Sequence, residues 1–326
     1  MRWEGEKESS NVEDRRGQRS GGGGFRLPIP GGGGARRGGG IGIGTIVIVV
    51  LAAWLFGINP LTLLGMFGGG GPMLEEVMPR EQVVQRPQPQ EPSIQARPGQ
   101  GQPGTASGTA TPQDAARSFV SVVLGSTEEV WTKLFATSGS RYPAPKLVLY
   151  SGMTQTACGA GSAAAGPFYC PADQKVYIDL SFYRTLRDKL GAPGDTAQAY
   201  VIAHEVGHHI QNLTGTMQKM ESARARMGER QYNELSVRLE LQADCYAGVW
   251  AHHTQRSRNW FEQGDIEEAL NAAAAVGDDH IQRQTQGMVV PDAFTHGTSK
   301  QRAYWFKAGM QTGSVDQCDT FTTRTP

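Results

Sequence analysis

His204, Glu205 and His208 form the pattern H-E-x-x-H, whose residue types and spacing suit a metal ion and a water-activating base. Residues four apart lie on one face of a helix, so His204 and His208 can direct two imidazole nitrogens at one tetrahedral ion. Glu205 lies one position further round the helix, where it can act as a general base on a water activated by the metal. The same five-residue pattern also arises by chance, so a third ligand has to support it.

The extended pattern H-E-x-x-H-x-x-G-x-x-H would supply a third ligand from its last histidine. That pattern requires Gly and His where this chain has Gln211 and Thr214. Further along the chain, Glu240 and Asp244 lie four apart in residues 236–250, which have helical periodicity. We predict that Glu240 is the third ligand and that Asp244 accepts a hydrogen bond from a ligating histidine. The alternative is an ordinary acidic helix surface.

Two helices must position these side chains. Residues 195–213 are predicted as one amphipathic helix that carries the first two ligands, and residues 236–250 as the helix that carries the third. Small residues on the second helix, Ala243, Ala247 and Gly248, would let the two helices approach closely enough to share an ion.

The chain contains the blocks MRWEGEKESSNVEDRRG at the start, FYCPAD (168–173), VYIDLSF (176–182), AQAYVIAHEVGHHIQNLTG (197–215), LELQADCYAGVWAHH (239–253), VGDD (276–279) and FTHGTSKQRAYWF (294–306). These blocks are similar to those of the bacterial putative neutral zinc metallopeptidase family. The resemblance covers most of the chain except the linker and implies a zincin-like catalytic domain. The paired motifs also resemble gluzincin-type proteases, in which a helix-borne glutamate is the third zinc ligand. Carried over here, this implies Zn²⁺ held by His204, His208 and Glu240, with Glu205 as the base.

A further histidine, His296, precedes a predicted helix that Thr298 or Ser299 can cap. A loop histidine commonly stabilises the oxyanion in gluzincin-type sites, and His296 could take this role. The resemblance itself implies only that His296 lies close to the zinc. The alternative is a histidine that only supports its loop. Arg302 on the same helix is expected at the surface, although it could pair with Asp244.

The remaining elements give an α+β fold that is mainly helical with a small sheet. Residues 146–151 and 175–181 are the strand candidates, and the second alternates apolar with polar residues, which predicts one buried face. This second strand comes before the helix predicted at residues 195–213, which carries His204 and His208. It is either an edge strand that could hold an extended peptide or a central structural strand.

The chain is divided by composition into four segments. Residues 1–40 are polar and rich in glycine, and we expect a disordered cytoplasmic N-terminus. Residues 41–64 are apolar over a length that can cross a bilayer once, which predicts one transmembrane helix. Residues 65–112 are a linker rich in Gly, Pro and Gln, and residues 113–326 form the zinc metallopeptidase domain. Arginines before the apolar span predict that the catalytic domain is periplasmic or extracellular, attached to a bacterial cell membrane by a single pass.

The four cysteines allow three disulfide connectivities. No two of them are spaced as a C-x-x-C motif. Because an external domain would be oxidised, we favour disulfides between Cys158 and Cys170 and between Cys245 and Cys318. Reduced, buried thiols are the alternative.

These features favour a membrane-anchored zinc metallopeptidase that acts on a peptide or protein substrate. Two other classes stay open: a non-catalytic zinc-containing envelope binding protein, and a metal-dependent deacylase, which would use Cys or His as third ligand. The intact Glu205 argues against the first, and Glu240 against the second. The formal net charge of 0 gives no electrostatic signature of a nucleic-acid partner, and no motif specifies a substrate or an oligomeric state.

Overall fold

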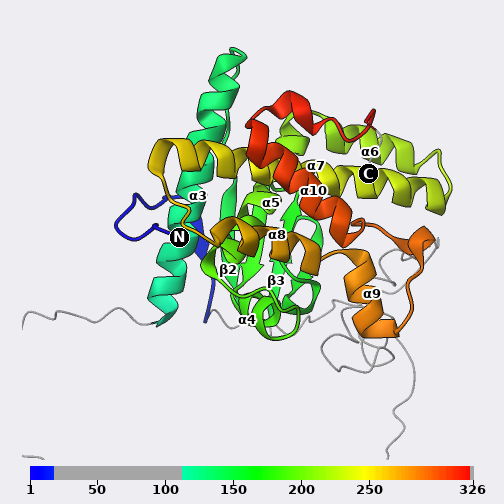
Figure 1. Ribbon diagram of the computed structural model, residues 1–326, viewed down its shortest axis with the longest axis horizontal. Coiled ribbons are helices and arrows are strands. Elements are labelled where there is room, and N and C mark those ends of the chain that lie inside the picture. Colours follow the sequence, from blue (N-terminus) through cyan, green and yellow to red (C-terminus); the bar gives the residue numbers. More distant parts are fainter. Residues whose placement is uncertain (18–111, 324–326) are drawn as a thin grey trace, which may run out of the picture.

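The computed structural model describes residues 1–17 and 112–323. A four-stranded sheet and a two-stranded hairpin lie on one side of a larger helical layer, as Figure 1 shows. The predicted mainly helical α+β fold is therefore confirmed. Its helices are α3 (Pro112–Thr137), α4 (Ser181–Asp188), α5 (Asp195–Leu213), α6 (Thr216–Arg224), α7 (Glu229–Arg258), α8 (Asp265–Ala275), α9 (Asp278–Gln286) and α10 (Ser299–Thr312), with 3-10 turns η1 (Ala163–Ala165), η2 (Pro291–Ala293) and η3 (Val315–Cys318).

The larger sheet has the strand order β1-β2-β6-β5. Strands β1 (Val12–Asp14), β2 (Lys146–Tyr150) and β6 (Lys175–Asp179) are parallel, whereas β5 (Phe168–Cys170) is antiparallel to β6. The strand expected at residues 175–181 is thus central, and the hypothesis that it presents an edge to a peptide is wrong. The edge beside the metal helix belongs to β5 instead, since α5 packs against it.

Both faces of β6 are buried, although the alternation of its residues predicts one. Val176 and Ile178 pack into the main core, and Tyr177 is equally buried on the opposite face in a smaller cluster. The reason is a second layer, the hairpin of β3 (Met153–Thr156) and β4 (Gly159–Ser162). Gly161 of this hairpin lies so close to the Phe168 ring that a Cβ there would meet it at 2.7 Å.

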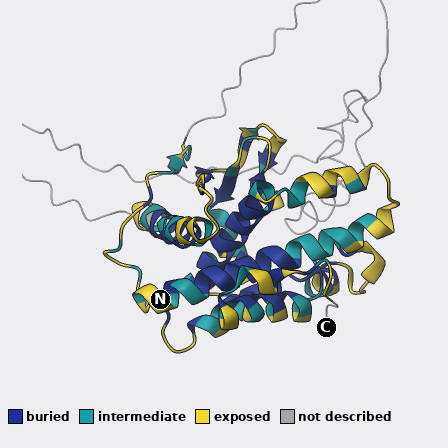
Figure 2. Ribbon diagram, turned by 90° about the horizontal axis from the view of Figure 1, so that it is seen from above, coloured by how far each residue is buried: buried dark blue, intermediate teal, exposed yellow. Residues whose placement is uncertain are grey.

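Helix α5 runs through the middle of the molecule, between the sheet and the helices α7 and α8. Most of its residues are buried, and Figure 2 shows buried, dark-blue helices at the centre of the molecule. The bounds of α5 are those predicted from the sequence. Helix α7 extends well beyond the predicted residues 236–250 at both ends.

Close helix packing depends on small residues, but not all of them face the expected partner. A Cβ on Gly207 of α5 would lie 3.0 Å from the carbonyl oxygen of Ala243, so these two residues set the contact between α5 and α7. Gly248 faces α10 instead, where a Cβ would lie 2.0 Å from the carbonyl oxygen of Phe306. Gly309 of α10 is equally close to the carbonyl oxygen of Cys245. The small residues of α7 therefore serve two neighbouring helices.

Both predicted disulfides are present. Cys158–Cys170 ties the β3–β4 turn to β5, and Cys245–Cys318 ties the middle of α7 to η3. The second bond closes a separation of 73 residues and fixes the C-terminal segment beside the helix that carries Glu240.

The expectation that residues 1–40 are disordered is wrong for residues 1–17, which form β1 and pack against α3. The predicted transmembrane segment 41–64 and nearly all of the linker 65–112 lie outside the described residues. Within the described residues, no helix has both the length and the apolar character needed to cross a membrane.

Candidate metal centre

Three side chains predicted as ligands meet where α5 crosses α7. His204 and His208 lie one turn apart on α5, and Glu240 comes from α7. One nitrogen or oxygen atom from each of the three lies within 4.8 Å of the others. The side chains are 8, 11 and 16% exposed, respectively. The fold thus brings the whole predicted ligand set to one partly accessible place.

Each imidazole presents one nitrogen to Glu240 and has the other held by a separate acceptor. Nε2 of His204 is 3.1 Å from Oε2 of Glu240, and Nε2 of His208 is 3.5 Å from Oε1. Nδ1–H of His204 donates to Asp244 over 2.8 Å, and Nδ1–H of His208 donates to Gln211 over 2.8 Å. Two Nε2 atoms and one carboxylate therefore surround a common point, and once the nitrogens are deprotonated this donor set fits a zinc ion.

The partner of His208 is itself fixed in orientation. The side-chain amide of Gln211 donates to the carbonyl oxygen of Leu239 over 2.6 Å and to Oε1 of Gln242 over 3.2 Å. These bonds turn its own Oε1 towards His208. In the sequence, Gln211 only excludes the extended ligand pattern. Its role in holding His208 depends on its hydrogen bonds to Leu239 and Gln242 of α7, which the sequence does not reveal.

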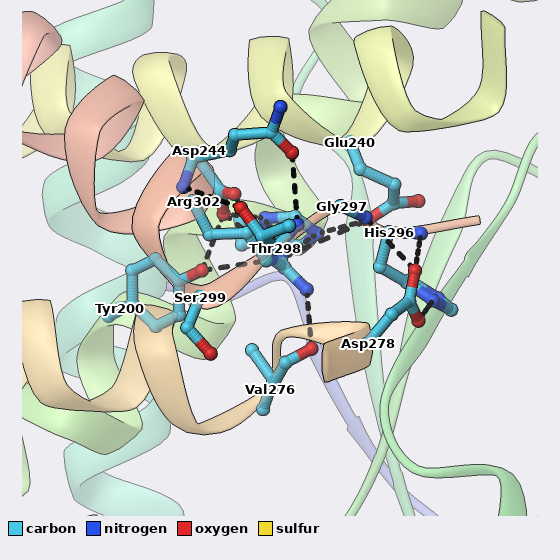
Figure 3. Close-up of polar contacts among 12 residues, drawn as sticks. Tyr200, Glu240, Asp244, Val276, Asp278, His296, Gly297, Thr298, Ser299 and Arg302 are labelled. Carbon is cyan, nitrogen blue, oxygen red and sulfur yellow. Dashed lines mark hydrogen bonds and ion pairs between the residues drawn. The ribbon is translucent and has the colours of Figure 1, made fainter. Parts of the chain in front are cut away.

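Asp244 is the centre of a fully buried polar network (Figure 3). It accepts from His204, from the hydroxyl of Tyr200 and from Arg302, whose Nε and Nη2 donate over 2.9 and 3.0 Å. Arg302 also donates to the carbonyl oxygen of Val276 over 3.2 Å. The expectation of a surface arginine is therefore wrong, because the close packing of α10 on α7 encloses Arg302.

The charges of this network favour one arrangement of protons in the metal-free protein. Burial raises the pKa of Asp244, but Arg302 and His204 outweigh it and hold the pKa below its usual value. Burial also raises the pKa of Glu240, and the neighbouring histidines lower it further than burial raises it. Burial lowers the pKa of His204, whereas Asp244 and Glu240 raise it, to about 9. Two carboxylates therefore stay ionised beside the histidines, as a cation site requires.

Glu205 is buried between the ligand positions and is only 7% exposed. Its burial raises its pKa above the usual value, and the charges of His208 and His204 oppose this in part. A carboxylate with a raised pKa accepts a proton more readily at neutral pH. This environment suits the predicted general base.

His296 lies in the loop before α10 and is held there by Asp278, the first residue of α9. Asp278 accepts the backbone N–H groups of residues 295, 296 and 297 and lies 3.1 Å from Nδ1 of His296. Burial lowers the pKa of His296, but Asp278 and the charge of Glu240 raise it overall. The loop thus holds His296 near the ligand set, and Figure 3 shows it facing Asp278.

Sequence reasoning missed Tyr200, Gln211 and Asp278. Tyr200 lies four residues before His204, so the helical spacing that paired the ligands also places this hydroxyl on their face of α5. Asp278 gave no such signal, because it comes from a different helix and resembles a cap. His209, in contrast, is not part of the ligand set: Nε2–H donates to the carbonyl oxygen of Pro143, and the hydroxyl of Tyr169 contacts Nδ1.

Comparison with known proteins agrees with this geometry. The chain is 48% identical over 327 residues to "Uncharacterized protein YpfJ" of Escherichia coli strain K12, covering 98% of this chain and 99% of the relative. It is 43% identical over 206 residues to "Uncharacterized protein Rv2575" of Mycobacterium tuberculosis, covering 60% of this chain and 67% of the relative. No solved structure matches the chain. The family described as "Putative neutral zinc metallopeptidase", whose cofactor is Zn²⁺, matches residues 1–321, and the chain belongs to this family.

Proposed function

We propose that the protein is a zinc-dependent metallopeptidase that hydrolyses peptide bonds. One observation carries this proposal: both Nε2 atoms of His204 and His208 face Glu240, while their Nδ1 atoms are held elsewhere. The three side chains supply three ligands, which is the number in catalytic zinc sites, whereas structural sites have four. A buried glutamate, Glu205, follows the first ligand directly.

His204, His208 and Glu240 would hold the zinc ion, which supplies Lewis-acid chemistry by polarising a carbonyl group and lowering the pKa of a water molecule. Glu205 removes the proton from the attacking water and delivers it to the amide nitrogen that leaves. The raised pKa of Glu205 helps it hold the proton between the two transfers.

His296 has the role of stabilising the oxyanion in this proposal. Its Nδ1 is held by Asp278, so Nε2–H is the group left to donate to a carbonyl oxygen as negative charge develops there. The pKa of His296 is raised by Asp278 and by the charge of Glu240, which extends the protonated, donating form to higher pH than for a free imidazole.

We also propose that the zinc domain lies in the periplasm or outside the cell. All four cysteines of the chain are paired, and disulfides persist in oxidising compartments. Attachment to a membrane through residues 41–64 stays a prediction.

The test uses the full-length protein, because a fragment that begins at residue 113 lacks β1. The zinc-loaded protein is incubated with a mixed peptide library, with and without chelator, beside Glu205→Gln and the surface control Glu234→Gln. We expect chelator-sensitive cleavage by the parent and the control, and turnover about 10²–10⁴-fold slower in Glu205→Gln with zinc retained.

Three outcomes contradict the proposal. Cleavage by Glu205→Gln at the parental rate would show that Glu205 is not the general base. A zinc-loaded parent that cleaves no peptide but releases acyl groups from acylated peptides would favour the deacylase. A zinc-loaded parent without either activity would favour the binding protein.

A further inference from the structure

The first 17 residues complete the sheet of the zinc domain. β1 runs parallel to β2 with Val12 opposite Leu147, and the sheet hydrogen bonds continue on either side of the strand. The N–H of Leu147 donates to the carbonyl oxygen of Asn11 over 2.9 Å, and the N–H of Arg15 donates to Leu149 over 2.8 Å. Without β1, the hydrogen-bonding groups of β2 on this side would be unpaired.

Side chains before β1 fix the same segment to α3. The hydroxyl of Ser9, a buried residue, donates to Glu128 over 2.6 Å, and Nδ2 of Asn11 donates to the same carboxylate over 2.8 Å. The N–H of Ser9 donates to the carbonyl oxygen of Ser121 over 2.9 Å. At Gly125 a Cβ would lie 3.1 Å from the carbonyl oxygen of Lys7, so the helix surface accommodates the segment closely.

The segment also contacts the helical half of the domain. The ring of Trp3 packs edge-on against Phe119 with centroids 5.1 Å apart. Glu6 accepts from Arg258 at the end of α7. The amine of Met1 lies 3.4 Å from Asp195, the first residue of the metal helix α5, and 3.1 Å from Asp265. These two aspartates belong to a second acidic cluster with Glu268, so this cluster already has a positive partner and suggests no second metal site.

We infer that residues 1–17 are an integral part of the zinc domain and lie in the same compartment as the zinc site. The two described parts of the domain end at residue 17 and begin again at residue 112. A single crossing between these points would place them on opposite faces of a hydrocarbon layer about 30 Å thick. Backbone hydrogen bonds of 2.8 and 2.9 Å between β1 and β2 exclude that separation.

This inference replaces the predicted topology, in which the N-terminus is cytoplasmic and the zinc domain external. Any contact of residues 41–64 with a bilayer has to leave both ends of the segment 18–111 on one face. A β1 supplied by a second copy of the chain would give the same result, because that copy's strand also has to reach β2.

The first experiment compares two exposed serines, Ser10 in the N-terminal segment and Ser140 between α3 and β2. All four native cysteines are in disulfides, so Ser10→Cys and Ser140→Cys each add the sole free thiol. Spheroplasts that express either full-length variant are treated with a membrane-impermeant maleimide before and after lysis. We expect the two positions to be labelled alike, both before lysis if the domain is external and both only after lysis if it is internal. Labelling of one position before lysis and of the other only after lysis would overturn the inference.

The second experiment tests the docking itself in the unmodified chain. Nζ of Lys175 on β6 lies 3.2 Å from Oε2 of Glu13 on β1, within reach of carbodiimide coupling. Mass spectrometry of digested membranes should find the amide between these two side chains, and Glu13→Gln should abolish it. Absence of this link in the parent would show that the segment is not docked. Neither result depends on peptidase activity, so failure here is distinct from failure of the proposed function.

Discussion

His204 and His296 are each oriented by an aspartate, but their surroundings differ sharply. Asp244, the partner of His204, is fully buried and also binds Arg302 and Tyr200. The side chain of His296 is 44% exposed, and its partner Asp278 mainly gathers backbone N–H groups of the loop. A metal ligand needs a fixed position before the ion arrives, whereas a group that acts on the substrate needs access. If His204 binds the metal and His296 acts on the substrate, as proposed, the two pairs place these tasks on a buried helix and on an exposed loop.

The largest expected effect comes from removing the buried aspartate. Asp244→Ala leaves Arg302 as a buried charge without its carboxylate, which should lower the free energy of unfolding by about 3–5 kcal/mol. It also frees Nδ1 of His204, so zinc affinity should fall about 10–100-fold. Denaturant unfolding of the metal-free protein and competitive zinc titration measure the two effects.

The exposed aspartate Asp188 provides the control for this change, because Asp188→Ala should alter neither quantity appreciably. Equal zinc affinity in Asp244→Ala and the parent would show that the buried network does not prepare His204. The His204–Asp244 pair would then differ from the His296–Asp278 pair only in its contribution to stability.

A smaller effect is expected for the neutral partner of His208. Gln211→Ala removes the acceptor of Nδ1 and the side-chain donor to the carbonyl oxygen of Leu239, but no buried charge results. We expect a loss of about 1–3 kcal/mol in unfolding free energy and of about 10-fold in zinc affinity. The same two measurements apply. A loss as large as that of Asp244→Ala would mean that charge is not what distinguishes the buried pair.

The sequence predicts well which side chains the fold brings together at the candidate site, because its information is local. The helix of His204 and His208 and the pair Glu240 and Asp244 depend on spacings of four residues, which the helix geometry converts directly into shared faces. The burial of Arg302 was not predictable in this way. It depends on the contact of Gly309 with the backbone of Cys245, and these two residues are far apart in the chain.

The N-terminal strand shows the same limit more strongly. Residues 1–17 are polar and charged, a composition that is typical of solvated segments. Their stabilising contacts are with elements more than 100 residues later and include the pairs Glu8–Ser118 and Ser9–Glu128. Neither residue of such a pair carries a periodic pattern that identifies the other. Only the assembled fold reveals the partner.

The smallest expected effect is that of Asp278→Asn, and it should depend on pH. The pKa of Asp278 is lowered overall, since His296 and backbone N–H groups outweigh the effect of burial. Its stabilising contribution is present above the unfolded value of about 3.9 and is lost as pH falls through the lowered pKa. The pKa of His296 is raised, so its contribution is complete below about 6.5 and is lost as pH rises through the raised value.

Both contributions are therefore present between about pH 4 and 6.5. In this window Asp278→Asn should reduce the free energy of unfolding by on the order of 1 kcal/mol, and the difference from the parent should shrink as the pH rises further. Denaturant unfolding of the metal-free protein at several pH values measures it, with His296→Gln as the control that lacks the titrating partner. A difference that does not change with pH would mean that Asp278 acts only through the loop backbone. His296 would then be positioned without an ion pair, and the likeness between the two histidine–aspartate pairs would end at their geometry.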